Sequence, residues 1–189
     1  MRIFIIFALS CLMTACAPFE PYKQDSHAVT YYNKAELAGK YHVFAIKDSG
    51  MSDRNIEFEN AFEKFYRHYG RGTQYEYNFE SRNQYSFQLD IIDSANIKVS
   101  YLKNDSTFRN IIVKYEIKPD GYLYINNRNF LMAGIPYIFG GIDIKKLRLT
   151  RDSGRNLIIE EVYHSSGALL LIFGDSKTWN TRHRYVKID

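Results

Sequence analysis

The chain has 189 residues, with 25 Lys and Arg against 21 Asp and Glu, which gives a formal net charge of +4. The basic residues form no dense run, so the composition excludes an extensive nucleic-acid-binding surface. The length suits a single domain, and the 16 Tyr and 13 Phe beside only four Pro favour β-strands.

The first residues have the layout of an export signal. Arg2 is the only charged residue before Glu20, and an almost unbroken apolar run extends from Ile3 to Met13. A basic start followed by roughly 7–15 apolar residues is typical of a secretory signal peptide, whereas a membrane-spanning helix needs about 20 apolar residues. We therefore expect residues 1–15 to be a signal peptide.

Both cysteines of the chain, Cys11 and Cys16, lie in this region. The residues Met13-Thr14-Ala15-Cys16 resemble the lipobox of bacterial lipoproteins. The resemblance implies cleavage before Cys16 and acylation of that residue, palmitate included, and Ala17 is compatible with export to the outer membrane. Cys11 is then discarded, so no disulfide forms in the mature chain. An ordinary signal peptide with an incidental cysteine is the alternative.

The domain organisation follows from these boundaries. The lipidated cysteine and the polar stretch after it, which contains Pro18 and Pro21 and has no periodicity, predict a flexible tether over residues 16–30. Residues 31–189 form a single β-rich domain. The resemblance places this domain at the periplasmic face of a Gram-negative outer membrane, with the membrane as a partner through the lipid anchor.

A first strand is predicted over residues 40–47, after a short turn or helix at "NKAELAG". A helix follows over residues 52–70, because aromatic side chains recur there at helical spacing. The series consists of Phe58, Phe62, Phe65, Tyr66 and Tyr69. This is the only long helix that the sequence predicts.

From Thr73 onward the apolar residues alternate with polar ones, which predicts a succession of strands separated by turns such as "PDG". A shift of the apolar phase between Ile144 and Leu147 predicts a β-bulge. The expected fold is mostly β with one helix (α+β). It is an antiparallel up-and-down meander that forms a barrel or a sandwich, with the helix packed on one end or face.

The stretch "ELAGKYHVFAI" is similar to the opening of lipocalin-like proteins, in which a short helix leads to a Gly-x-Trp at the start of the first strand. Gly39 and Tyr41 occupy those positions here, with Tyr in place of Trp. The resemblance implies a lipocalin-like barrel. It also implies that a basic residue of the last strand, Arg182 or Arg184, packs over the aromatic ring.

No enzyme motif and no metal-ligand spacing is present among the five histidines, so we expect no catalytic residue, no cofactor and no metal. Glu160 and Glu161 near His164 form the one acid cluster. Because neighbouring residues of a strand point to opposite faces, we expect one of the two glutamates to face solvent.

The most unusual segment is "FLMAGIPYIFGG", from Phe130 to Gly141, which contains no charge. It is either a buried strand or loop that closes the core, or an apolar lid or partner-binding loop. The candidate binding residues are the apolar ones of this segment and two tyrosines of an earlier strand: Phe130, Ile135, Tyr137, Phe139, Tyr75 and Tyr77.

Three functions remain open. The first is a β-rich domain that binds a small amphipathic or lipidic ligand in a hollow interior. The second is an interaction module for an envelope protein, either an accessory of envelope assembly or an inhibitor of a periplasmic enzyme, for which a filled core and an exposed apolar patch are expected. The third and weakest is an envelope hydrolase, which requires a buried carboxylate–histidine pair in a cleft.

Overall fold

A computed structural model describes residues 18–19, 21, 26–46, 60–66, 83–135, 139–169 and 173–188. Side chains are described for these residues except for 63, 66, 126–135, 139–143, 167–169 and 173–175. Most of the predicted strands from residue 85 onward can therefore be compared with the structure, whereas the predicted strand that contains Tyr75 and Tyr77 lies outside the described residues.

The described part of the chain is an all-β antiparallel meander. Its nine strands form one sheet of order β8-β7-β6-β5-β4-β3-β2-β1-β9. The elements are η1 (Lys34–Leu37), β1 (Gly39–His42), α2 (Ala61–Tyr66), β2 (Tyr85–Ile91), β3 (Asn96–Lys103), β4 (Ser106–Ile117), β5 (Leu123–Ile135), β6 (Phe139–Arg151), β7 (Leu157–Leu169), β8 (Phe173–Tyr185) and β9 (Lys187–Ile188). The predicted meander is confirmed.

The sheet is not closed into a barrel, so the closed lipocalin-like barrel that the sequence suggested is absent. Its two edges, β8 and β9, are separated by Val186 alone. The isolated bridge Ile46↔Arg184 and a hydrogen bond from the His42 amide to the Val186 carbonyl (2.9 Å) link the segment around β1 to this stretch. Because β1 has only four residues, it cannot pair along the thirteen residues of β8.

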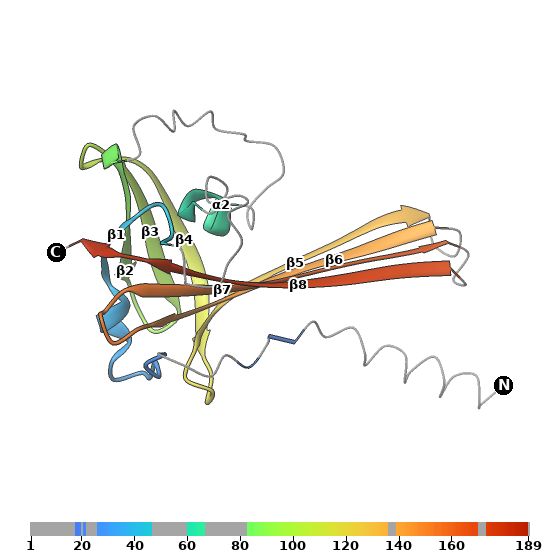
Figure 1. Ribbon diagram of the computed structural model, residues 1–189, viewed down its shortest axis with the longest axis horizontal. Coiled ribbons are helices and arrows are strands. Elements are labelled where there is room, and N and C mark those ends of the chain that lie inside the picture. Colours follow the sequence, from blue (N-terminus) through green and yellow to red (C-terminus); the bar gives the residue numbers. More distant parts are fainter. Residues whose placement is uncertain are drawn as a thin grey trace.

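The molecule consists of a packed body and a projecting arm (Figure 1). The body contains β1–β4 and the adjacent parts of β5–β8. We define the arm as the four-stranded part of β5–β8 beyond the paired row Asn129, Lys145, Tyr163 and Trp179. The arm exists because β4 pairs with β5 only through Leu123–Ile125, whereas β5–β8 continue to pair with one another for their whole length.

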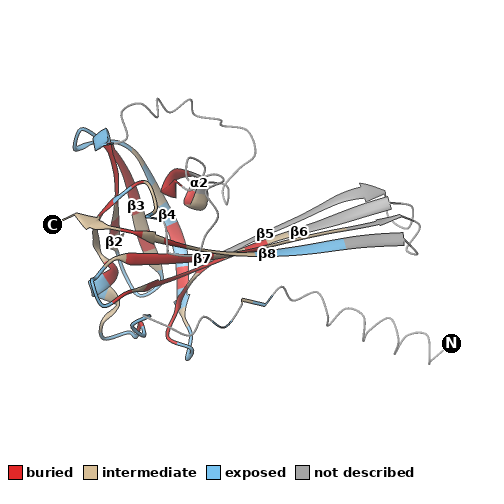
Figure 2. Ribbon diagram, in the orientation of Figure 1, coloured by how far each residue is buried: buried red, intermediate tan, exposed pale blue. Residues whose placement is uncertain are grey.

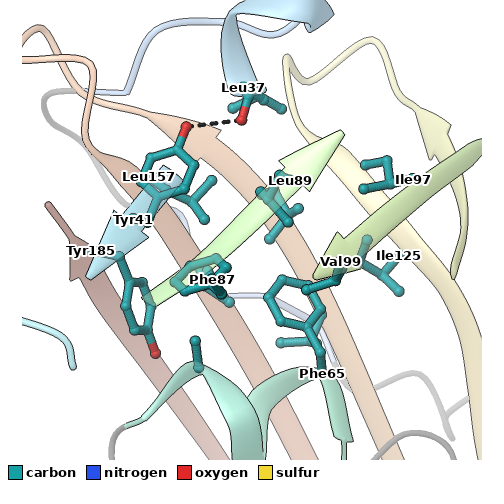
Figure 3. Packing of buried hydrophobic residues seen from close by; sticks show 14 of the residues in the cluster. Leu37, Tyr41, Phe65, Phe87, Leu89, Ile97, Val99, Ile125, Leu157 and Tyr185 are labelled. Atoms are coloured by element: carbon teal, nitrogen blue, oxygen red, sulfur yellow. Dashed lines mark hydrogen bonds between the residues drawn. The ribbon is translucent and has the colours of Figure 1, made fainter. Parts of the chain in front are cut away.

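Most of the buried residues lie in the body (Figure 2), where aromatic and aliphatic side chains pack together (Figure 3). The rings of Tyr41 and Phe87 stack with their centroids 5.4 Å apart, and Phe87 meets Tyr185 edge-on at 5.6 Å. The hydroxyl of the buried Tyr41 donates a hydrogen bond to the carbonyl of Leu37 (2.8 Å). The alternating residues of the predicted strands therefore form the core of the body.

Helix α2 packs against one face of the sheet, as predicted. Its Phe62 and Phe65 are buried, and the Phe62 ring lies 4.8 Å from that of Tyr101. The helix has six residues, and no helix of seven or more occurs within the described ranges, so the predicted long helix and the α+β class are wrong for this part of the chain. Phe58 and Tyr69 lie outside the described residues.

Residues from the stretch predicted as a tether contact the body. The His27 amide donates to the Arg151 carbonyl (2.8 Å), and the Val29 amide donates to the Gly121 carbonyl (2.7 Å). Val29 is buried in the core cluster. Closer to the N-terminus, the Phe19 ring lies 4.4 Å from the guanidinium carbon of Arg148. The segment from Phe19 to His27 therefore contacts the sheet at two residues of β6, Arg148 and Arg151.

The predicted β-bulge and the predicted basic residue over Tyr41 both differ in position from the structure. The irregularity expected between Ile144 and Leu147 lies on the paired strand, where the register shifts between Ile125 and Asn129. The basic group over the Tyr41 ring is the ammonium of Lys187, at 5.9 Å. Arg182 lies instead 3.8 Å from Glu160, and Arg184 lies 3.3 Å from Asp152.

Candidate functional site

The uncharged segment forms the ends of two arm strands. Phe130 and Ile135 lie in β5, and Phe139 begins β6. The segment is thus neither a loop over the core nor a strand within it, because these parts of β5 and β6 project away from the body (Figure 1). Tyr137 lies outside the described residues, as do Tyr75, Tyr77 and Cys16.

The strand register brings a second apolar segment to the same end of the arm. Ile135 pairs with Phe139, Phe139 with Leu169, and Leu169 with Phe173. These four residues, which we call the end row, stand at one level across all four strands. Sequence reasoning missed Leu169 and Phe173: the stretch "ALLLIF" predicted a strand, but only the register shows that it ends beside Ile135 and Phe139.

Small residues follow the end row toward the body. The next level consists of Gly134, Gly140, Ala168 and Gly174, and the level after it of Ala133, Gly141, Gly167 and Asp175. Asp143 and Lys177 lie two levels closer still to the body. At about 3.3 Å per residue, the end row lies roughly 13 Å beyond the level of Asp143. Between the end row and the level of Asp143, Asp175 is therefore the one charged residue of the described strands.

The arm has two open edges. Beyond Ile125, β5 pairs with β6 on one side, and β8 pairs with β7, so the outer backbone groups of both strands have no strand partner in the described sheet. Such edges are usually protected by charged side chains. The β8 edge of the arm carries the exposed Lys177, which fits this pattern.

A buried ion-pair cluster lies at the base of the arm on the side of α2. The Glu161 carboxylate accepts from the ammonium groups of Lys64 and Lys145, each at 2.8 Å. Burial raises the pKa of Glu161, but the two ammonium groups outweigh it and lower that pKa to about 2. The cluster therefore ties α2 to β6 and β7 through a charged carboxylate.

A second cluster lies on the opposite face of the same strands. The Arg148 guanidinium contacts the Glu160 carboxylate through two nitrogens at 2.5 Å, and the Tyr122 hydroxyl donates to Glu160 at 3.4 Å. The expectation that one glutamate faces solvent is wrong. The side chains do point to opposite faces, but α2 covers Glu161, and Arg148 with Tyr122 covers Glu160.

His183 is the buried histidine of this region. Burial and the charge of Lys64 lower the pKa of its imidazole to about 3, so the ring is neutral at pH 7. The carboxylate of Glu161 is already engaged by two lysines. This arrangement favours a structural role for these groups, since a general base needs a carboxylate or imidazole that can reach a substrate.

Tyr163 and Trp179 form an aromatic pair where the arm begins. Their rings stack with centroids 5.4 Å apart and planes 29° apart, and Trp179 is 47% exposed. Trp179 is the single tryptophan of the chain. It therefore serves as a natural fluorescent marker of the arm, six residues away from Phe173 of the end row.

No protein-family model, curated protein or solved structure that was compared with the chain matches it. In the described part of the chain, no helix is long and apolar enough to span a membrane. The same residues contain no cluster of three or more His, Cys, Asp or Glu side chains that could hold a metal ion.

Proposed function

We propose that the protein is a lipid-anchored envelope lipoprotein, acylated at Cys16, whose arm inserts its end into a lipid bilayer. The observation that supports this most directly is the end row of Ile135, Phe139, Leu169 and Phe173. Two consecutive hairpins bring uncharged residues to one level, at the end of the arm that points away from the packed core in the described part of the chain (Figure 1). An interior ligand site is disfavoured, since side chains fill the described core.

Hydrophobic transfer supplies the driving force for insertion. Burial of a large apolar side chain stabilises by roughly 1.5–3 kcal/mol, and the end row offers four such residues. The two sequence segments between these strands, 136–138 and 170–172, add Ile138, Leu170, Leu171 and Ile172 and no charge. This is enough to offset the loss of freedom on binding and to hold the arm end in the acyl-chain region.

The open edges limit the depth of insertion. Unpaired backbone groups of a sheet edge are not tolerated in hydrocarbon, because water cannot reach them there. The arm should therefore insert its end row and the segments beyond it, while Asp175, two levels closer to the body, remains in the headgroup region or in water. At about 3.3 Å per residue this depth is roughly 7 Å, a small part of the ~30 Å hydrocarbon core.

An experiment on the acylated protein in phosphatidylcholine vesicles tests this proposal. The variant Phe139→Trp in a Trp179→Phe background places the only tryptophan in the end row. Its fluorescence should shift to the blue and should be quenched by lipids brominated on their acyl chains. The unmodified protein is the matched control, because its Trp179 lies well above the expected depth and should be quenched little. Equal, weak quenching of both would overturn the proposal.

The open edges also favour a second candidate, an interaction module that recruits an envelope protein. An extended segment of that protein would add a strand to β5 or β8 of the arm, as in other cases of strand addition. The partner would then cover the end row as well. In that case the tryptophan of the Phe139→Trp variant would stay accessible to an aqueous quencher in vesicles and become protected when the partner binds.

A further inference from the structure

A pocket of about 340 Å³ opens in the body at the end of β6 opposite to the arm. It is lined by Glu36 of η1, Arg151 at the end of β6, Arg155 in the turn that follows, and Lys187 of β9. Three cations and one anion give this lining a net charge of +2. Its position, about 40 Å along β6 from Phe139, separates it from the end row.

Arg155 is the least satisfied of the three cations in this lining, since Arg151 pairs with Glu36 and Lys187 donates to the Ala38 carbonyl. It is exposed, and its guanidinium has no side-chain partner among the described residues. Its φ is 64°, in the left-handed region that residues other than glycine rarely adopt. Asn would adopt this conformation with less strain. Strain of this kind concentrates at functional sites.

Lys187 is held in place beside the pocket. Its ammonium donates to the Ala38 carbonyl at 3.0 Å. The chain adopts a φ of 149° at Gly39, and a Cβ at that position would lie 2.5 Å from Cε of Lys187. The absence of a side chain at Gly39 therefore provides the space that the lysine occupies.

Arg151 forms an ion pair with the half-exposed carboxylate of Glu36. This carboxylate balances one of the three cations and occupies a guanidinium that could otherwise bind an anion. An anionic ligand would therefore compete with Glu36 for Arg151, while Arg155 and Lys187 provide the excess positive charge.

We infer that this pocket binds a phosphate group, either inorganic phosphate or a phosphate monoester. Guanidinium groups match the oxygen geometry of phosphate, and an ammonium adds a point charge. A phosphate monoester carries about −1.5 to −2 at pH 7, which complements the lining charge of +2. A single carboxylate would neutralise only half of it. The inference is independent of the bilayer insertion proposed for the arm.

Nuclear magnetic resonance of the acylated protein in neutral detergent micelles tests the site. Inorganic phosphate at pH 7.5 should shift the side-chain Nε–H resonances of Arg151 and Arg155 in a saturable manner. Loss of one charge-assisted hydrogen bond should weaken binding about tenfold in Arg155→Asn and in Lys187→Gln. Glu36→Gln should strengthen it, since the competing carboxylate is removed. Arg155→Asn should also fold well, because Asn tolerates the left-handed conformation.

Lys114→Gln is the matched control, since it removes the same charge from an exposed position of β4 outside the pocket. Its affinity for phosphate should stay close to that of the unmodified protein. Equal weakening by Lys114→Gln and Arg155→Asn would show diffuse attraction and overturn the inference, as would shifts that do not saturate.

The source of the phosphate group is distinguished by a second titration. Monomeric dihexanoyl phosphatidylglycerol offers a lipid phosphodiester with one negative charge. Stronger binding of inorganic phosphate supports the inference, whereas stronger binding of the lipid, sensitive to Arg155→Asn, would assign the pocket to a lipid headgroup and overturn the choice of a free phosphate or monoester. Failure of both probes to bind would overturn the site.

Discussion

The ammonium of Lys64 in α2 lies 2.8 Å from the carboxylate of Glu161 in β7, although 97 residues separate them in the sequence. Glu161 is on the strand that continues into the arm, and Lys64 is on the helix that covers the core. This contact therefore joins the docking of α2 to the base of the arm. Both side chains are almost buried, so the pair is little weakened by solvent.

Replacement of Lys64 by Met should destabilise the protein by about 1–3 kcal/mol, because the buried Glu161 loses one of its two charged donors. Urea unfolding followed by circular dichroism measures this change. Lys118→Met is the control, since the pair of Lys118 with Glu116 is about half exposed and such pairs contribute about 0–1 kcal/mol. An equal loss of unfolding free energy in the two variants would show that the Lys64–Glu161 contact does not stabilise the packing of α2 on the sheet.

The stability of the protein should fall as the pH falls from about 6.5 to about 2. The unfolded chain protonates His183 below about 6.5, but burial keeps the folded imidazole neutral down to a pKa of about 3. The unfolded chain protonates Glu161 below about 4.5, but the folded carboxylate does so only near 2. Between its unfolded and its folded pKa, each group therefore lowers the free energy of unfolding by up to about 1.4 kcal/mol for each unit by which the pH falls.

The variant His183→Gln separates these two windows. It should flatten the dependence of the unfolding free energy on pH between about 6.5 and 4.5, and it should leave the loss between 4.5 and 2 that belongs to Glu161. The slope is measured by urea unfolding at several pH values, whatever the absolute stability of the variant. An unchanged slope above pH 4.5 would contradict the low pKa of His183.

Truncation of Phe62 or Phe65 to Ala should cost about 3–5 kcal/mol, because each ring is buried between α2 and the sheet. The control is Ile112→Ala on β4, where the side chain is 59% exposed and the cost should stay near 0.5 kcal/mol. Thermal unfolding provides the comparison. A fall in melting temperature of a degree or less for Phe65→Ala would mean that the helix does not stabilise the core.

The double variant Ile135→Ser, Phe139→Ser should retain most of the stability of the body, since both positions lie in the arm. Its lipid insertion should be lost, because two of four apolar residues of the end row are replaced. Leu123→Ser on the same β5 strand is the contrasting variant, since Leu123 is fully buried in the core and a cavity with a buried hydroxyl should cost several kcal/mol. Equal losses of stability would remove the distinction between arm and body.

Cys16→Ser should release the protein from the membrane fraction or block its processing, since the proposed lipoprotein carries its acyl chains on Cys16. Fractionation of cells that produce the variant, with mass spectrometry of the N-terminus, measures both effects. A variant that is cleaved at the same bond and still sediments with outer membranes would contradict the lipoprotein proposal.

The sequence predicts the strands well because alternation reports one buried face, and Phe62 and Phe65 are buried as their spacing indicates. Alternation cannot report how far a sheet closes, which here depends on the brevity of β1. Nor can it align Ile135 with Phe173 across three pairings, since the irregularity between Ile125 and Asn129 shifts the register of β5. The contact of Lys64 with Glu161 likewise depends on tertiary packing.

The contact between Phe19 and Arg148 sets a length scale for the whole protein. Three residue steps separate Phe19 from Cys16, which corresponds to about 11 Å of extended chain. Nine residues of β6 separate Arg148 from Phe139, or roughly 30 Å. Under the proposed function, an acylated Cys16 and an inserted arm end are two attachment points joined by a stiff spacer, this length of β6. Such a spacer either lies flat along one membrane or keeps two apposed membranes at a fixed separation.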